Sequence, residues 1–191
     1  MKGDMGRKDS RRLVLAAYDI FSILVAALIV FVITIGFFFR VIGVDGDSMK
    51  PTLYNGDRLL LAEYISDFHH GDIVVIDRYN EKPLIKRVIA VGGDTVDITY
   101  SGDGTIVLVN GQTQYESYTQ GVTVKNDFDR MITVPEGYYF VLGDNRNNSK
   151  DSRHLEIGVV NREQIKGKVW IRVYPFQRIG ALKAGKEQGN E

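Results

Sequence analysis

The stretch that decides the fold is Ile20–Phe39, IFSILVAALIVFVITIGFFF, which is twenty residues long and contains no charged side chain. A helix rises about 1.5 Å per residue, so this length spans about 30 Å, the thickness of a bilayer core. Its β-branched residues do not oppose a helix, because lipid forces backbone groups to hydrogen-bond within the segment. No polar face recurs at helical spacing, which disfavours a buried core helix. We therefore expect a transmembrane anchor over residues 13–40.

A cleaved leader peptide is the alternative to an anchor. The apolar region of such a leader is roughly 7–15 residues long and ends in small residues. This stretch is longer and ends in the bulky sequence Gly36-Phe37-Phe38-Phe39-Arg40. The sequence therefore favours an anchor that is not cleaved.

The charges that flank the apolar stretch predict its orientation. Before it lie five basic residues, Lys2, Arg7, Lys8, Arg11 and Arg12, against Asp4 and Asp9, and Asp19 lies at its inner edge, where a charge is tolerated. Only two basic residues, Arg40 and Lys50, follow the stretch closely. The positive-inside rule then makes residues 1–12 a basic cytoplasmic tail and places everything after Arg40 outside the cytoplasm, with a single pass through the cell membrane.

The composition of the chain excludes several classes of protein. The chain has 191 residues, with 24 basic residues against 24 acidic ones, so no net field attracts nucleic acid. It has no cysteine, which excludes disulfides, thiolate metal sites and a cysteine nucleophile. Three histidines are too few for a rich metal site. The roughly 150 residues after the anchor can bury a core of their own.

The remainder of the chain predicts a mainly β fold, an antiparallel sheet or barrel-like domain over residues 41–181. Short segments rich in Val, Ile, Tyr and Thr alternate with Gly- and Asn-rich turns. A hairpin is expected around Asn110-Gly111, a helix near Asn161–Ile165 and a flexible tail over residues 182–191. The expected strands are Arg58–Glu63, Asp72–Asp77, Leu84–Val91, Thr95–Tyr100, Thr105–Val109, Met131–Val134, Tyr138–Leu142 and Lys168–Tyr174.

Two residues of this domain have the chemistry of a nucleophile and its base. Ser48 follows the anchor in Gly46–Leu53, GDSMKPTL, and a serine hydroxyl needs a base within hydrogen-bond reach. Lys86 opens the apolar segment KRVIAV, where strict alternation puts Lys86, Val88 and Ala90 on one face. Burial there would lower the pKa of the lysine and make it a base. Each residue alone also has a simpler interpretation, Ser48 as a turn residue and Lys86 as a charge that protects an edge strand.

A third stretch, Gly143–Arg153 with the sequence GDNRNNSKDSR, completes a resemblance to the bacterial type I signal peptidases. The chain resembles this family over nearly its whole length, in the anchor, in the SMxPTL stretch, in Gly71–Val75, in the Lys-Arg stretch and in the GDNRxNSxDSR stretch. The resemblance implies that Ser48 is the acylating nucleophile, Lys86 its general base and Ser149 the residue that orients the lysine. It also implies structural salt bridges of Arg87 with Asp144 and of Asp151 with Arg153.

The sequence departs from some members of the family at one position. Those members have a serine two positions before the nucleophile, whose hydroxyl contributes to the oxyanion hole, whereas this chain has Gly46. The backbone N–H of Ser48 should supply one oxyanion donor, and the second is left open. Residues 101–136 are expected to form a small β extension, shorter than in longer relatives, which makes this a compact form similar to those of Gram-positive bacteria. Met49 either contacts the substrate or membrane or packs in the core.

The resemblance implies a function and partners. The expected enzyme is a serine endopeptidase that removes signal peptides from secretory preproteins near the translocation channel, at the surface of the lipid bilayer. It requires no cofactor, no metal and no nucleic acid. Two alternatives remain from other classes. One is a self-cleaving Ser–Lys protease of the SOS-repressor type, which needs a DNA-binding domain where this chain has its apolar stretch. The other is an anchored β module without catalytic activity.

Overall fold

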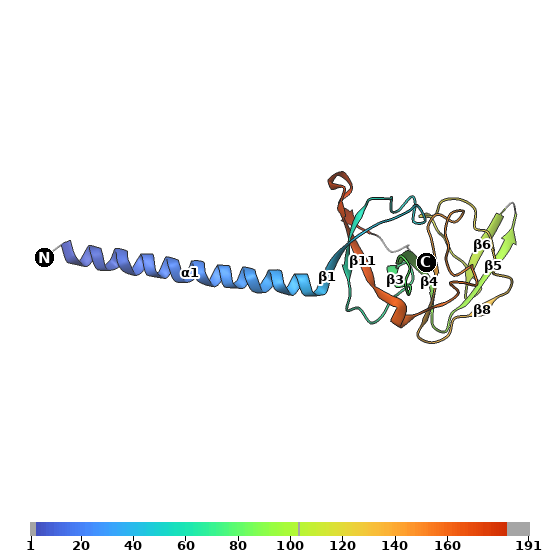
Figure 1. The fold of residues 1–191 in the computed structure, drawn as a ribbon, viewed down its shortest axis with the longest axis horizontal. Coiled ribbons are helices and arrows are strands. Elements are labelled where there is room, and N and C mark those ends of the chain that lie inside the picture. Colours follow the sequence, from blue (N-terminus) through green and yellow to red (C-terminus); the bar gives the residue numbers. More distant parts are fainter. Residues whose placement is uncertain (1–2, 103, 183–191) are drawn as a thin grey trace. The chain divides into compact units, whose positions relative to one another are not determined.

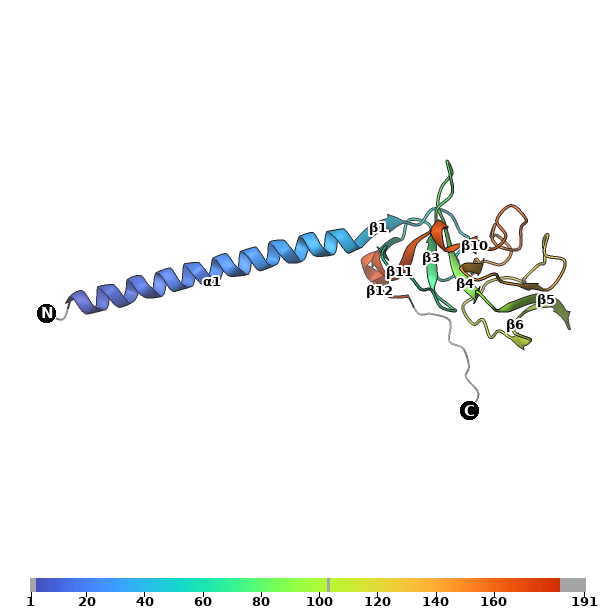
Figure 2. The ribbon, with the colours of Figure 1, turned by 90° about the horizontal axis from the view of Figure 1, so that it is seen from below.

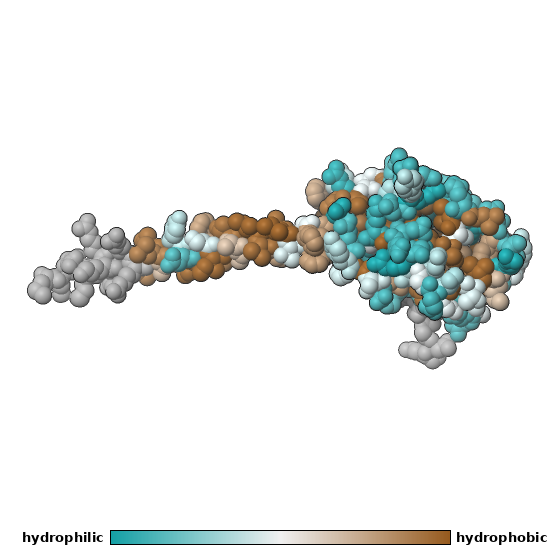
Figure 3. Space-filling view, turned by 60° about the horizontal axis from the view of Figure 1, so that its bottom comes forward, coloured by the Kyte–Doolittle hydropathy of each residue, from teal (hydrophilic) through white to brown (hydrophobic). Residues whose placement is uncertain are grey.

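The computed structural model describes residues 3–102 and 104–182, which fall into two compact units that meet between Phe39 and Arg40. The first unit is a single helix, α1 (Gly3–Phe38), and the second contains the sheets (Figure 1). By length and composition, Leu13–Phe38 can cross a membrane, and none of this segment is buried. Most of the side chains that this segment shows in Figure 3 are apolar, apart from a hydrophilic patch near its N-terminal end. A core helix is buried, so this exposure supports the anchor and not a buried helix.

The end of the helix differs from the predicted end of the anchor. The helix stops at Phe38, and Phe39–Gly43 form strand β1, which pairs with β2 (Arg58–Ala62). The prediction placed Phe39 and Arg40 within the anchor. Phe37, Phe38 and Phe39 are equally apolar, so hydropathy carries no signal for the change from helix to strand. The pairing with β2, which is remote in the sequence, accounts for this boundary.

The second unit is built on an eight-stranded main sheet. Its order is β1-β2-β11-β3-β4-β9-β10, and β12 pairs with β11. The pairs β2–β11, β11–β3, β3–β4, β4–β9 and β9–β10 are all antiparallel, so the predicted mainly β, antiparallel fold is confirmed. Figure 2 shows β3, β4 and β11 beside one another. The remaining bounds are β3 (Ile73–Ile76), β4 (Leu84–Val91), β9 (Tyr138–Leu142), β10 (Val160–Asn161), β11 (Ile165–Tyr174) and β12 (Gly180–Ala181).

A second, four-stranded sheet lies in the order β7-β6-β5-β8. Its strands are β5 (Thr95–Ser101), β6 (Gly104–Val109), β7 (Gln112–Thr113) and β8 (Ile132–Thr133). The predicted hairpin is confirmed, because β6 and β7 pair across Asn110 and Gly111, whose φ angles are 53° and 76°. Positive φ at both positions is typical of a type I′ turn. Of the described residues in 101–136, which were expected to form a small β extension, only Ser101, β6, β7 and β8 belong to this sheet, which begins earlier, at Thr95.

The C-terminal part of the body differs in detail from the prediction. The helix expected near Asn161–Ile165 is one 3₁₀ turn, η1 (Arg162–Gln164), which Asn161 and Gln164 close as a capping box. A second 3₁₀ turn, η2 (Phe176–Arg178), precedes β12. Leu182 was assigned to the flexible tail, yet its N–H donates to the Trp170 carbonyl at 3.0 Å and its side chain packs on the core. The remainder of that tail, residues 183–191, lies outside the described residues.

The core around β4 explains why strict alternation fails there. The pairing of β4 with β9 shifts register between Val88 and Ala90. Consequently Ile89 and Ala90 pack in the same hydrophobic cluster, although alternation predicts opposite faces for them. Residues 86–90 are all buried, so β4 is covered on both sides. A lysine on this strand is therefore enclosed, and the interpretation of Lys86 as an exposed edge charge is wrong.

Candidate active site

The turn that carries Ser48 is held in place by its apolar neighbours. Met49 and Leu53 are 2% and 0% exposed and pack in one cluster with strands β2, β3 and β11. The Leu53 N–H donates to the Met49 carbonyl at 2.8 Å, and the Gly46 N–H donates to Asn55 Oδ1 at 3.1 Å. Met49 therefore packs in the core, which settles the choice that the sequence left open. Ser48 itself remains half-buried at the surface of the turn.

Lys86 meets Ser48 from the facing strand. Its side chain is 2% exposed, and Nζ lies 2.7 Å from Ser48 Oγ. Burial lowers the pKa of Lys86 to about 8 from 10.5, and the charge of Arg153 acts in the same direction. The carboxylates of Asp151 and Asp144 oppose the shift. An amine with this pKa is about one-fifth neutral at pH 7.4, whereas an ordinary lysine is neutral in about one case per thousand.

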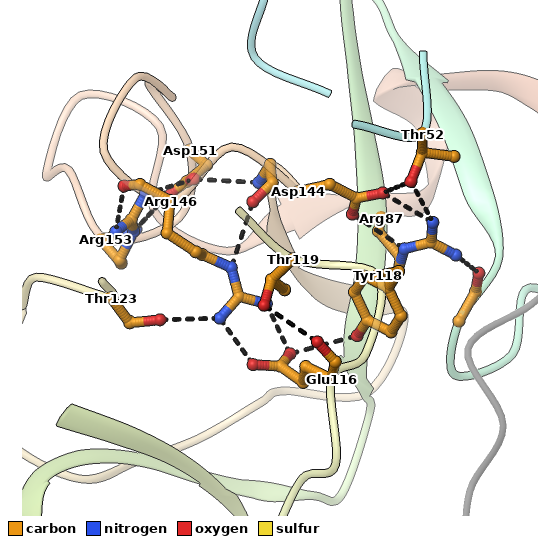
Figure 4. A network of polar contacts seen from close by, with 12 residues as sticks. Thr52, Arg87, Glu116, Tyr118, Thr119, Thr123, Asp144, Arg146, Asp151 and Arg153 are labelled. Carbon is orange, nitrogen blue, oxygen red and sulfur yellow. Dashed lines mark hydrogen bonds and ion pairs between the residues drawn. The ribbon is translucent and has the colours of Figure 1, made fainter. Parts of the chain in front are cut away.

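Asp144 joins the segments that carry the two residues. Arg87 follows Lys86 on β4, and its Nε and Nη2 donate to the two oxygens of Asp144 at 2.9 and 2.7 Å. Thr52 Oγ1 donates to Asp144 Oδ2 at 2.5 Å (Figure 4). The Arg87 and Asp144 side chains are each 1% exposed, so their charges are enclosed together. Asp144 thereby fixes the serine turn and strand β4 to one point on the loop that follows β9.

The same loop, residues 143–153, is closed by a second buried ion pair. Arg153 Nε and Nη2 donate to the two oxygens of Asp151, both at 2.8 Å, and both side chains are fully buried. Burial alone would raise the pKa of Asp151, but the hydrogen bonds and charge of Arg153 and the Gly143 N–H hold it below its ordinary value. Asp151 therefore remains ionised and keeps the loop in shape.

Ser149 lies on this loop in close packing with the serine turn. Its Oγ is buried and makes no hydrogen bond of ordinary geometry among the residues that the structure describes, although its hydroxyl contributes to the lowered pKa of Asp151. A Cβ placed on Gly143 would lie 2.1 Å from Ser149 Oγ and 2.5 Å from the Ser48 carbonyl oxygen. Only a glycine at position 143 allows the loop and the turn to approach so closely. The resemblance implies a hydrogen bond from Ser149 to Lys86, and this conformation does not contain it.

The backbone of Ser48 is oriented by Asn145. The Asn145 N–H donates to the Ser48 carbonyl at 3.0 Å, and its side-chain amide donates to the Asp47 carbonyl at 3.1 Å. Among the described residues, the Ser48 N–H donates no hydrogen bond. Asn145 and Thr52 were not assigned a role from the sequence. Both occur in the stretches that carry the resemblance, so their positions were the available signal.

The paired side chains open into a cleft of about 490 Å³. Polar residues of the serine turn form one side, and the start of β4 and the 143–153 loop contribute the other. Such a cleft can admit an extended peptide beside Ser48 Oγ. The lining residues are Asp45, Gly46, Asp47, Ser48, Asn55, Leu84, Lys86, Asn148 and Lys150.

Comparisons with known proteins show the family to which the chain belongs. Residues 17–174 match the model of the family "Signal peptidase, peptidase S26". A signal peptidase I of Bacillus amyloliquefaciens is 35% identical over 180 residues, which cover 88% of this chain and 94% of the relative. Signal peptidase I S of Bacillus subtilis is 35% identical over 168 residues, which cover 82% of this chain and 88% of the relative.

Two further matches come from other Gram-positive genera. Signal peptidase IB of Staphylococcus aureus is 35% identical over 176 residues, with 82% of this chain and 88% of the relative covered. A solved signal peptidase I of Enterococcus faecalis is 31% identical, covers 55% of this chain and 97% of that one, and superposes with a TM-score of 0.43. The chain is a membrane-anchored serine endopeptidase, and it belongs to the signal peptidase family, peptidase S26.

Proposed function

We propose that this chain removes signal peptides from secretory preproteins, with Ser48 as the nucleophile and Lys86 as the general base. The observation that carries this proposal is the 2.7 Å contact between Lys86 Nζ and Ser48 Oγ, made by a lysine whose pKa burial lowers to about 8. A hydroxyl becomes an effective nucleophile when a neutral base lies within hydrogen-bond reach. The names of the relatives supply the class of substrate.

The chemical steps follow from the positions of these groups. Ser48 Oγ attacks the scissile carbonyl while Lys86 Nζ accepts its proton, and the Ser48 N–H donates to the oxyanion that forms. The amide C–N bond then breaks, and Lys86 returns the proton to the departing amine, which is the new N-terminus of the mature protein. Lys86 next removes a proton from water, which attacks the ester carbonyl; the bond to Ser48 Oγ then breaks, Lys86 returns the proton to Oγ, and the signal peptide leaves with a new carboxylate. The second oxyanion donor stays open.

Ser149 is proposed to orient the amine of Lys86 during these steps. Its buried Oγ has an unused hydrogen-bond capacity among the described residues. The proposed interaction is a hydrogen bond from Lys86 Nζ to Ser149 Oγ. The pairs Arg87–Asp144 and Asp151–Arg153 are proposed as structural supports, because each is buried and each fixes one end of the 143–153 loop.

The proposed topology puts the site where preproteins emerge. The basic residues 1–12 remain in the cytoplasm, the anchor crosses the membrane once, and the body lies outside, beside the translocation channel. Ser48 is only ten residues beyond Phe38, where the helix ends. The chain between them cannot reach further than about 36 Å. The active site is thereby held near the membrane surface, where a signal peptide ends.

The experiment that tests the proposal compares variants of the full-length protein in detergent with a preprotein as substrate. Wild type should release the signal peptide, whereas Ser48→Ala and Lys86→Ala should lose activity by a factor of about 10³ or more. Lys86→Arg should also be inactive, because an arginine stays protonated. Equal cleavage by all four proteins would refute the dyad. Cleavage by none of them, with the fold intact, would favour an anchored binding module.

A further inference from the structure

A segment outside the predicted site, residues 115–123, crosses the 143–153 loop between β7 and β8. We name it the bridging segment. The Gln120 N–H donates to the Asp144 carbonyl at 2.8 Å, and the Arg146 N–H donates to the Gln120 carbonyl at 2.9 Å. These two bonds form a parallel β-bridge between Gln120 and Asn145. The backbone of the bridging segment therefore hydrogen-bonds to the loop on both sides of Asn145.

Glu116 of the bridging segment holds the guanidinium of Arg146. The Arg146 side chain is 1% exposed, and its two Nη atoms contact the two oxygens of Glu116 at 2.6 and 2.5 Å (Figure 4). Its Nη1 also donates to Thr123 Oγ1 at 2.8 Å, and its Nε donates to the Gly143 carbonyl at 3.1 Å. A buried cation is costly when its partner is removed, so Glu116 decides where Arg146 lies.

Tyr118 of the same segment supports the other arginine. The Arg87 guanidinium carbon lies 4.1 Å from the centroid of the Tyr118 ring, in cation–π geometry. The Tyr118 hydroxyl donates to Glu116 Oε1 at 3.1 Å. Burial raises the pKa of Tyr118, and the charge of Glu116 acts in the same direction, so the hydroxyl remains a donor. One carboxylate thus fixes both Arg146 and the ring beneath Arg87.

Each of the two arginines is next in the sequence to a residue that belongs to the dyad or contacts it. Arg146 is adjacent to Asn145, whose N–H donates to the Ser48 carbonyl at 3.0 Å. Arg87 is adjacent to Lys86 on β4. We propose that Glu116 and Tyr118 are positioning residues that hold Ser48 and Lys86 in register through Arg146 and Arg87. This inference rests on the proposed function, because it assumes that the contact between Ser48 and Lys86 is the catalytic one.

The expected effect is on turnover and not on substrate binding. Neither Glu116 nor Tyr118 lines the cleft beside Ser48. A misplacement of about 1 Å between reacting groups can lower a rate by about 10²-fold. We expect Glu116→Gln and Tyr118→Leu to lower kcat roughly 10- to 100-fold, with KM for the same preprotein unchanged within about twofold. Tyr118→Phe keeps the ring under Arg87 and should retain most of the turnover.

The experiment measures kcat and KM of the full-length variants in detergent, together with amide hydrogen exchange of the peptide that contains Asn145. Tyr115→Leu is the matched control, because Tyr115 belongs to the same segment and its side chain is 66% exposed. The proposal predicts faster exchange at Asn145 and lower kcat in Glu116→Gln and Tyr118→Leu, and neither change in Tyr115→Leu.

Three results would overturn the proposal. One is a normal kcat in a folded Glu116→Gln protein, the second is faster exchange without loss of turnover, and the third is a rise in KM alone. If Glu116→Gln does not fold, the comparison of Tyr118→Leu with Tyr118→Phe decides, since equal kcat in these two also refutes it. Cleavage by Ser48→Ala would refute the proposed function and not the positioning role. Hydrogen exchange at Asn145 does not depend on catalysis, so it would still show whether Glu116 and Tyr118 hold this loop.

Discussion

At the scale of single residues, the site depends on an amine that the fold keeps partly uncharged. Lys86 is 2% exposed, and among the described residues its amine donates a side-chain hydrogen bond to Ser48 Oγ alone. The two carboxylates that raise its pKa, Asp151 and Asp144, are each paired with an arginine, whose positive charge offsets theirs. The effect of burial on the pKa of Lys86 therefore exceeds that of the opposing charges, and this pKa is about 8.

The first prediction concerns the pH dependence of cleavage. Only neutral Lys86 can accept the Ser48 proton, so kcat/KM should rise with pH, inflect near the pKa of about 8 and level off above it. The measurement is the rate of preprotein cleavage by the full-length enzyme in detergent across this range. An inflection near pH 6.5, which is about the ordinary pKa of a histidine, would contradict the role of Lys86 as the base. A rate that does not change with pH would contradict it too.

The second prediction concerns stability. The pKa of Lys86 is about 8 in the folded state and 10.5 when exposed, so the unfolded chain binds more protons between these values. The free energy of unfolding should therefore rise with pH through this window, and below pH 8 the full cost of about 3 kcal/mol is present. Lys86→Met removes that cost, so it should be inactive yet more stable at pH 7, by up to about 3 kcal/mol.

Denaturant unfolding followed by the fluorescence of Trp170, the single tryptophan, provides the measurement for this stability prediction. Lys82→Met is the control, since Lys82 is 85% exposed and carries no desolvation cost of this kind. The gain in Lys86→Met should shrink as the pH rises from 8 towards 10.5. A variant less stable than wild type at pH 7 would show that Lys86 is not held at a cost.

At the scale of elements, β11 is the strand that joins β2 and β3 within the main sheet. It pairs with β2 through Lys168–Tyr174 and with β3 through Ile165–Lys168, so Lys168 pairs with both strands, and both pairings contain register shifts. Gly167 lies where these two neighbours meet. A Cβ there would stand 2.1 Å from the Ala62 carbonyl oxygen and 2.9 Å from its carbon. Because these are backbone atoms of β2, they cannot move aside as a flexible side chain would.

The third prediction follows from this close approach. Gly167→Ala should lower the free energy of unfolding by roughly 1–3 kcal/mol or more, since the backbone of β2 must shift. Gly180→Ala is the matched control, because Gly180 also lies on a strand of this sheet and has nothing within 4 Å of a new Cβ. The measurement is again denaturant unfolding. Equal stability of the two variants would show that β11 and β2 separate without cost.

The sequence predicted the elements better than their contacts, for physical reasons. β4 and β9 were placed correctly because runs of Val, Ile and Leu between turn residues define them locally. β1 was missed because its Phe39 continues an apolar run, and only pairing with a remote strand makes it extended. Ser48, Lys86 and the loop pairs were found in recognisable stretches. Glu116 and Tyr118 were not, since no local pattern distinguishes a carboxylate that meets an arginine thirty residues away.

At the scale of the whole molecule, an apolar anchor and a charged β body must lie in different solvents. The segment Leu13–Phe38 is 26 residues long and would span about 39 Å as a helix, more than the roughly 30 Å core of a bilayer. The body buries its own core and the two ion pairs Arg87–Asp144 and Arg153–Asp151, without a cysteine anywhere in the chain. Its stability therefore does not depend on the redox state of the compartment that it occupies.

The fourth prediction is that this body lies on the outer side of the membrane. Because the chain has no cysteine, a single introduced one reports its own location. Tyr79 is 94% exposed, so Tyr79→Cys should react with a membrane-impermeant maleimide on intact protoplasts. Ser10→Cys, among the basic residues before the anchor, should react only after permeabilisation. The opposite pattern would reverse the topology, and a body inside the cytoplasm could not meet signal peptides after their export.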